Sequence, residues 1–214
     1  MFEKIVSCAE RRSFVHSAVC LAFLTLAAVG LTDGQQAQET KPRVSDKPLT
    51  AEQIAVYKVV LHGWMDKELS TVNLSIQTVS FPTSGAFDAS GCGKDLDLES
   101  VEPEVVHRFR AADMAQLSSG KVSLVDPDRQ RKEVADNDPE KTIRKGKSIE
   151  EAVRNGFAHG LVTLSEIRFD KEHKHAIVSY SFFCGSLCGN GGAVILEKID
   201  GAWQRKSQCG AWIS

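Results

Sequence analysis

This 214-residue chain lacks a large excess of either charge, because it has 26 lysines and arginines and 28 aspartates and glutamates. The formal net charge of −2 leaves no broad basic surface for the phosphates of a nucleic acid or an anionic membrane. The basic residues of segments 129–132 and 141–147 alternate along the chain with the carboxylates of Glu133, Asp136, Asp138 and Glu140 between the two segments, which is typical of a solvated surface. We therefore expect no nucleic-acid partner, and membrane attachment only through an uncleaved export signal.

Motifs that carry well-known chemistry are absent as well. There is no G-x-S-x-G elbow for a nucleophilic serine and no C-x-x-C redox pair. The glycines between 185 and 192 are not followed by a helical pattern, so they do not fit a dinucleotide-binding loop. Segment 145–148 lacks the preceding glycine of a P-loop, and segment 136–147 lacks the glycine and glutamate of a calcium loop. The sequence predicts no cofactor.

The longest apolar run covers residues 18–31. Basic residues precede it, and Ala28-Val29-Gly30 provides the small residues of a signal-peptide cleavage site. The run of about 14 residues is shorter than the roughly 20 that a spanning helix needs. We predict a signal peptide over 1–30 and a secreted or periplasmic protein, with a single-pass membrane anchor as the alternative.

The remainder of the chain is predicted to be one domain behind a linker. Residues 31–49 are polar and contain two prolines, so we expect a disordered linker there. Residues 50–214 are enough for a single domain with a sizeable core.

Helical patterns dominate the first half of this domain. Thr50 and Gln53 form a capping box before a helix over 51–64, and a second capping box at Ser148 opens a helix over 148–158 that Gly160 ends. Strand patterns cover 72–78 and 122–125, and a weak helical pattern covers 103–117. We interpret segment 126–147, with breaks at its two Asp-Pro pairs, as an irregular surface excursion.

From residue 161 the hydrophobic pattern has a period of two. It predicts strands over 161–169, 175–183, 193–199 and 202–213, joined by a charged turn, a glycine-rich loop and an Asp200-Gly201 hairpin turn. The predicted fold class is α+β, with an antiparallel β-meander in the C-terminal half and helices from the N-terminal half packed on one face.

Four cysteines follow the predicted signal, namely Cys92, Cys184, Cys188 and Cys209, and an even number in an exported chain indicates disulfides. A two-residue turn at Asp200-Gly201 places Cys209 opposite Gly192, at the mouth of the glycine-rich loop. This favours Cys188 with Cys209 and leaves Cys92 with Cys184, although all three connectivities stay open. A zinc site made of the four cysteines is the alternative.

Two histidines are candidates for a catalytic base, His107 in the weak helical pattern and His159 at the end of the second helix. A catalytic imidazole needs a carboxylate to orient it and a hydroxyl to activate. The candidates for those roles are Asp113 or Glu166 and Ser165 or Ser179. Such a set would make a small secreted hydrolase.

Glu172, His173 and His175 lie in a charged turn, where two alternate histidines could bind zinc or copper if further ligands were near. A metal-binding protein that uses these residues or the four cysteines is therefore a third hypothesis.

The C-terminal segment resembles the ends of exported bacterial proteins of unassigned activity, through CG-x-LCG-x-G at 184–191, K-x-x-G-x-W at 198–203 and a closing Trp212-Ile213-Ser214. A looser resemblance, to nuclear-transport-factor-2-like domains, implies a cone-shaped α+β fold whose concave sheet forms a pocket. Our first hypothesis is an exported, non-catalytic module that binds a small molecule or a protein. Its three tryptophans would lie in the core or at a pocket rim, at Trp64, Trp203 and Trp212.

Overall fold

The structure is a computed structural model that describes residues 42–65, 71–82, 91–100, 105–117 and 121–214. Residues Glu39–Ser214 form one compact unit. The predicted signal peptide and the first part of the predicted linker lie outside the described residues. Within the described ranges, no helix has the length and apolarity needed to cross a bilayer.

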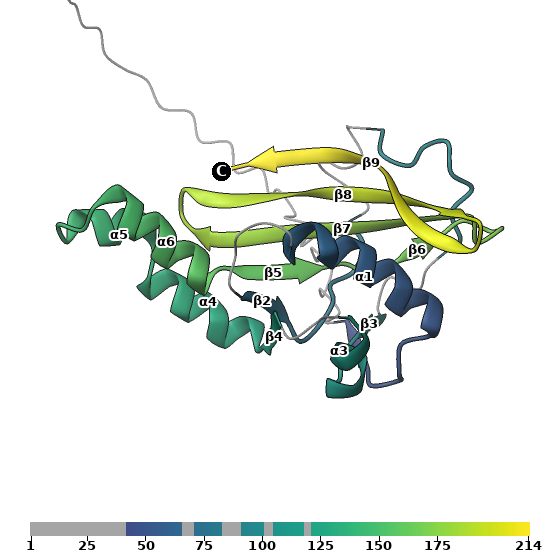
Figure 1. The fold of residues 1–214 in the computed structure, drawn as a ribbon, viewed down its shortest axis with the longest axis horizontal. Coiled ribbons are helices and arrows are strands. Elements are labelled where there is room, and N and C mark those ends of the chain that lie inside the picture. The colour runs from purple at the N-terminus through teal and green to yellow at the C-terminus, as the bar shows by residue number, and fades with distance from the viewer. Residues whose placement is uncertain (1–41, 66–70, 83–90, 101–104, 118–120) are drawn as a thin grey trace, which may run out of the picture. The chain divides into compact units, whose positions relative to one another are not determined.

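The centre of the unit is a seven-stranded mixed sheet (Figure 1). Its strands run in the order β4 (Val122–Val125), β2 (Val72–Ser75), β5 (Leu161–Leu164), β7 (His175–Gly185), β8 (Cys188–Ile199) and β9 (Ala202–Ile213), with β6 (Arg168–Phe169) paired to β7 alone. The pairs from β5 to β9 are antiparallel, which confirms the predicted meander. β2 lies parallel to both β4 and β5 and joins the N-terminal half to the meander.

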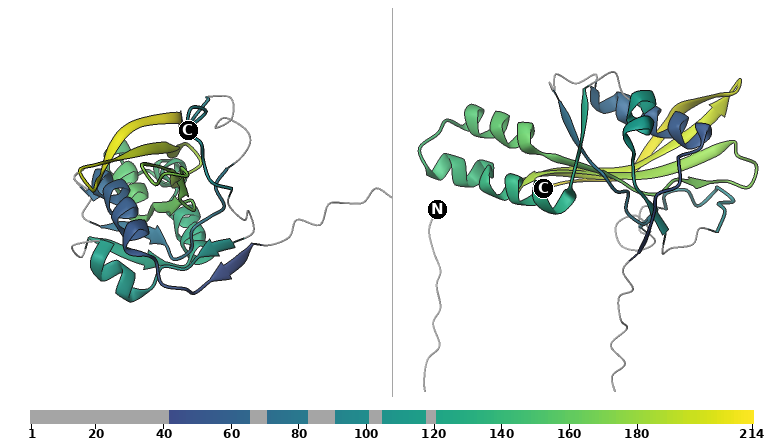
Figure 2. Two further views of the ribbon diagram at one scale, coloured as in Figure 1. Left: turned by 90° about the vertical axis from the view of Figure 1, so that its right-hand side faces the viewer. Right: turned by 90° about the horizontal axis from the view of Figure 1, so that it is seen from below.

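Two hydrophobic clusters lie on opposite faces of this sheet, as the alternation of β7 shows. Ala176 and Val178 belong to the main cluster, whereas Ile177 between them belongs to a smaller cluster with Phe81 and Ala193. Helix α1 (Ala51–Met65) covers the main cluster, in which Tyr57 and Leu61 are fully buried. Figure 2 shows α1 and α3 (Ala111–Leu117) on the same side of the sheet. The expected helix packing on one face is therefore present.

The capping boxes predicted from the sequence are both at helix starts. The backbone N–H of Gln53 donates to the Thr50 hydroxyl at 3.2 Å, and the backbone N–H of Thr50 donates to Oε1 of Gln53 at 2.9 Å. The hydroxyl of Ser148 accepts from the N–H of Glu151 at 3.1 Å and begins α6 (Ile149–His159). Gly160 follows this helix, as predicted, and a side chain there would collide with the ring of Phe182.

The irregular excursion predicted over 126–147 is wrong, because the segment forms α4 (Pro127–Asp136) and α5 (Pro139–Arg144). Each Asp-Pro pair is a helix start. Asp126 accepts from the N–H of Arg129, and Asp138 accepts from the N–H groups of Glu140 and Lys141. Proline at the first helical position loses no hydrogen bond, because that N–H has no partner within the helix.

A separate two-stranded sheet corrects two further predictions. β1 (Arg43–Ser45) lies in the segment predicted as a disordered linker, and it pairs in parallel with β3 (Val105–His107), which lies in the predicted helical pattern. The backbone of β1 is ordered by these hydrogen bonds rather than by burial of its own side chains. His107 consequently belongs to a strand, and the folded unit begins before Thr50.

The favoured disulfide pairing is also wrong, because Cys92 pairs with Cys209 and Cys184 pairs with Cys188, with Cα separations of 5.7 and 5.0 Å. The Asp200-Gly201 turn starts the register as predicted, with Ile199 opposite Ala202, but one irregularity, between Ile195 and Leu196, shifts Cys209 by one residue to a position opposite Ala193. The glycines at 189, 191 and 192 belong to β8, and the turn is only Ser186-Leu187. Cys184 and Cys188 therefore face each other across this turn.

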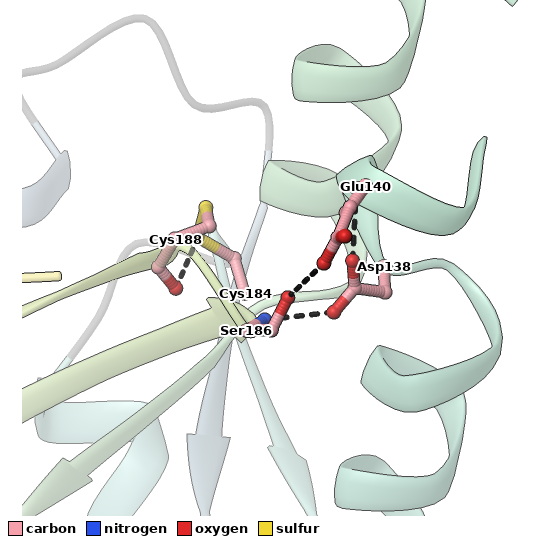
Figure 3. Close-up of a disulfide and its surroundings, with 5 residues drawn as sticks. All are labelled: Asp138, Glu140, Cys184, Ser186 and Cys188. Carbon is pink, nitrogen blue, oxygen red and sulfur yellow. Dashed lines mark hydrogen bonds between the residues drawn. A yellow bond between two sulfur atoms is a disulfide. The ribbon is translucent and has the colours of Figure 1, made fainter. Parts of the chain in front are cut away.

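The Cys184–Cys188 disulfide closes a hairpin tip that docks on α5 (Figure 3). The backbone N–H of Ser186 donates to Oδ2 of Asp138 at 2.7 Å, while Oδ1 of the same carboxylate accepts from the N–H of Glu140 at 2.8 Å. Gly185 adopts a φ of +144°, and a Cβ there would lie 2.7 Å from Pro139. One carboxylate thus begins α5 and attaches it to the end of the sheet.

The two disulfides are expected to differ in their contribution to stability. Replacing Cys92 and Cys209 by serine frees a loop with a sequence separation of 117. This should lower the free energy of unfolding by about 5 kcal/mol, whereas the Cys184/Cys188 double serine variant should lose about 2 kcal/mol. Urea denaturation measures both losses. Mass spectrometry of a non-reduced digest tests the pairing itself, and a peptide linking Cys188 to Cys209 would contradict it.

Candidate functional site

His107 and Glu166, named from the sequence as a base and its orienting carboxylate, are in direct contact. Nδ1 of His107 lies 2.8 Å from Oε2 of Glu166, and the backbone N–H of His107 donates to Oε1 at 2.8 Å. The hydroxyl of Thr78 also donates to Oε1. Glu166 is only 6% exposed, so these donors replace water around a buried carboxylate. The contact orients the imidazole and, among the described residues, leaves Nε2 without a partner.

A hollow of about 570 Å³ lies beside this histidine on the β1–β3 sheet. Strand alternation explains its lining, because residues two apart on paired strands share one face. Arg43 lies opposite Val105, and Ser45 lies opposite His107. These four residues line the hollow together with Asp46, Lys47 and Glu166.

The charges at the hollow favour an anion. Arg43 and Lys47 add two cations, while Asp46 is paired with Arg108 at 3.4 Å. The hydrogen bond that the His107 ring donates to Glu166 raises the pKa of His107 above its ordinary value, although burial of the ring and the charge of Lys47 act against this. The carboxylate of Glu166 already accepts from Thr78 and His107, so its charge is largely compensated.

The serines proposed as nucleophiles do not reach this histidine's free ring nitrogen. Ser165 is fully buried, and its hydroxyl donates to the carbonyl of Glu166 at 2.8 Å while accepting from the N–H of Ser179 at 2.9 Å. The hydroxyl of Tyr57 donates to the carbonyl of Ser165 at 2.9 Å. Burial and the nearby charge of Glu166 raise the pKa of Tyr57 well above its usual value, so this phenol stays neutral. These groups form a structural network beneath the site, and Ser179 lies outside the hollow.

His159, the second candidate base, lies elsewhere. It lines another hollow, of about 420 Å³, with residues of β4 and α4 that include Arg129 and Glu133. Its carbonyl accepts from the side chain of Gln130 at 2.6 Å. No hydrogen bond joins its ring to a carboxylate within the described chain. Asp113 is buried and accepts from the N–H and guanidinium of Arg110, so it orients neither histidine.

His173 and His175, the candidate metal ligands, belong to two different ion-pair groups. Nδ1 of His173 lies 2.9 Å from Glu52, and its ring stacks on Phe169. Nδ1 of His175 lies 2.9 Å from Asp170, and its Nε2 lies 3.3 Å from Glu197. The four-cysteine zinc site is wrong because all four cysteines are in disulfides. Across the described ranges, no group of three or more His, Cys, Asp or Glu side chains could hold a metal ion.

The tryptophans were expected in the core or at a pocket rim, and the structure describes the side chains of two of them. Trp203 is in the core, where Nε1 has no hydrogen-bond partner in the described structure. Trp212 is 41% exposed and covers Gly191, where any Cβ would collide with the indole. The side chain of Trp64 lies outside the described residues.

Sequence reasoning missed Arg43, Ser45 and Lys47 because they fall in the predicted linker. The only local signal is Val44, a single β-branched residue between two polar ones, which is too short a pattern to identify a strand. Their position depends on pairing with β3, more than fifty residues later in the chain.

Comparisons with known proteins give no match to a protein-family model, to a curated protein or to a solved structure. The two resemblances drawn from the C-terminal segment therefore stay predictions.

The His107–Glu166 contact leads to a pH-dependent prediction. Because the folded-state pKa of His107 is raised, its contribution to stability is present below pH about 6.5 and is lost as the pH rises through the folded value. Glu166→Gln should lower the pKa of His107, since a neutral amide stabilises the imidazolium less. Histidine titration by NMR measures this. His159→Gln is the control, and an unchanged His107 titration in Glu166→Gln would contradict the assignment.

Proposed function

We propose that this protein is an exported, non-catalytic binding domain that takes a small anionic ligand in the hollow beside His107. The observation that carries the proposal is the convergence of Arg43, Lys47 and the anchored His107 ring on one hollow. Two disulfides indicate an oxidising compartment, which supports export to the periplasm or the cell exterior. The bacterial origin implied by the C-terminal segment belongs to the same proposal.

A small carboxylate or phosphate suits the chemistry of the hollow. Two flexible cations and an imidazolium can surround a ligand that carries one or two negative charges. His107 is held in place by a buried carboxylate, so little ordering of its ring is needed when a ligand binds. Val105 adds an apolar wall for a short hydrocarbon segment of the ligand.

Binding of inorganic phosphate and of succinate tests this proposal. Either anion should shift the NMR signals of His107, and the affinity should fall as the pH rises and the imidazolium loses its proton. Arg43→Gln and Lys47→Gln should each weaken binding about tenfold, as expected for loss of a charge-assisted hydrogen bond. Lys58→Gln, an exposed lysine of α1, is the matched control and should bind normally. If neither anion perturbs His107 at millimolar concentration, the anion site is wrong.

A small secreted hydrolase is the second candidate, and a specific observation favours it. The contact between Nδ1 of His107 and Glu166 is the arrangement that orients a catalytic imidazole, and Ser45 lies opposite His107 in the register of β1 and β3. In this alternative, Nε2 would take the hydroxyl proton of Ser45 as the oxygen attacks an ester carbonyl, and would return it to the leaving alcohol.

Hydrolysis of p-nitrophenyl acetate separates the two candidates. A hydrolase should lose a hundredfold or more in kcat/KM on His107→Ala, as is typical for loss of a general base, and Ser45→Ala should lose a similar factor. His159→Ala should keep full activity. If the protein binds anions and shows no hydrolysis that depends on His107, the hydrolase is excluded and the binding function is supported.

A further inference from the structure

We propose that the hairpin formed by α5, the turn at 145–148 and α6 is a docking surface for an anionic phospholipid membrane. Residues 139–159 are called the helical arm below. The proposal goes beyond the ligand hollow, which lies on the separate β1–β3 sheet. Figures 1 and 2 show the arm beyond the end of the sheet at which β7 turns into β8, so the turn of the arm is the outermost described part there.

An apolar stripe runs along the arm. Ile149, Val153 and Phe157 of α6 are 69%, 41% and 37% exposed, and their spacing of four residues places them on one helix face. Ile143 of α5, which is 40% exposed, lies on the other side of the turn. The helix packs against the rest of the unit through its buried residues, Ala152 and Gly156. The ring of Phe157 also packs against the ring of Phe182, with 5.3 Å between the centroids, so the accessible part of the stripe is greatest at Ile149 and Val153.

In the tertiary structure, the basic residues of segment 141–147 are exposed, whereas the carboxylate of Asp138, which precedes them in the sequence, is buried. Segment 141–147 contains four basic residues and no carboxylate. Asp138, which precedes it, is 6% exposed and turned toward the N–H of Ser186 (Figure 3). The carboxylate of Glu140 also reaches the hydroxyl of Ser186, at 3.2 Å.

A positive balance is left on the exposed part of the arm. Two exposed carboxylates, those of Glu150 and Glu151, and the half-buried carboxylate of Glu140 stand against five exposed cations. Each carboxylate pairs with a basic residue four positions away. Exposed pairs of this kind are weak, so their cations can turn to a second partner.

An anionic lipid membrane suits this combination of exposed isoleucines and lysines better than a purely polar partner or a neutral membrane does. Isoleucines at the turn can enter the boundary between headgroups and acyl chains, while lysines beside them reach lipid phosphates. A purely polar partner would not use Ile143 and Ile149, and a neutral lipid would not use Lys141 and Lys145. This surface departs from the expectation, drawn from overall charge, that the folded domain does not contact membranes.

Vesicle flotation tests the proposal with the compact unit 39–214, which contains the whole described core and lacks the apolar run at 18–31. Phosphatidylcholine vesicles with phosphatidylglycerol should bind the protein, and raising the salt from about 0.05 to 0.5 M should release it. The double variant Ile143→Ser with Ile149→Ser should weaken partitioning at least about tenfold. Lys141→Gln with Lys145→Gln should weaken it roughly twentyfold.

Two matched controls keep the test specific. Ile199→Ser removes an isoleucine of similar exposure, 44%, at the far end of β8, and Lys58→Gln removes an exposed lysine of α1. Both should bind vesicles like the unmodified unit. Circular dichroism confirms that each variant is folded, which is expected because all the changed side chains are exposed.

Three results would overturn the proposal. One is equal binding to vesicles of phosphatidylcholine alone, and another is unchanged binding by the isoleucine double variant. The third is reversible self-association in sedimentation equilibrium that the isoleucine variant abolishes without any vesicle binding, which would make the stripe a contact between two copies of the chain. None of these results affects the hollow beside His107.

Discussion

The buried carboxylate of Glu166 is the interaction on which the arrangement of this protein depends. It accepts from the ring N–H and the backbone N–H of His107 and from the hydroxyl of Thr78, so it joins β3 to the segment after β2 and to the segment after β5. A buried carboxylate without donors would be strongly destabilising, which means that these segments must meet in this geometry. The adjacent Ser165 extends the network to α1 through Tyr57 and to β7 through Ser179.

This constraint also places the ligand hollow. Holding His107 on Glu166 fixes β3, and β3 in turn orders β1 by parallel pairing, which brings Arg43 and Ser45 to the same face. The buried polar groups described above beneath the site have hydrogen-bond partners, so this network forms a rigid base for the hollow. At the opposite end of the unit, Asp138 has a comparable role, since one carboxylate starts α5 and docks the hairpin tip that the Cys184–Cys188 disulfide closes.

Local signals predicted the elements whose causes are local. The capping boxes at Thr50 and Ser148 and the alternating strands after residue 161 depend on neighbouring residues, and each is present. The two Asp-Pro pairs were misread because the same dipeptide can end a helix or begin one, and here Asp126 and Asp138 begin one. The favoured disulfide pairing is wrong because the glycine-rich segment continues β8 up to Cys188, five residues from Ala193, which lies opposite Cys209. The irregularity between Ile195 and Leu196 shifts the register by only one further residue.

By itself, the sequence determined the fold class, the meander and the presence of disulfides. Hydrophobic periodicity and capping residues depend on neighbours in the chain, and the number of cysteines is a property of the whole chain, so none of these signals requires knowledge of the tertiary structure. The sequence also indicated His107 and Glu166 as candidates, since an imidazole can act as a base and a carboxylate can orient it in any fold. Only the tertiary structure decided that these two touch, that Arg43 and Lys47 join them, and that Asp138 turns away from the lysines beside it. Those outcomes depend on pairing between remote segments, where the burial of a few polar groups selects one arrangement among many.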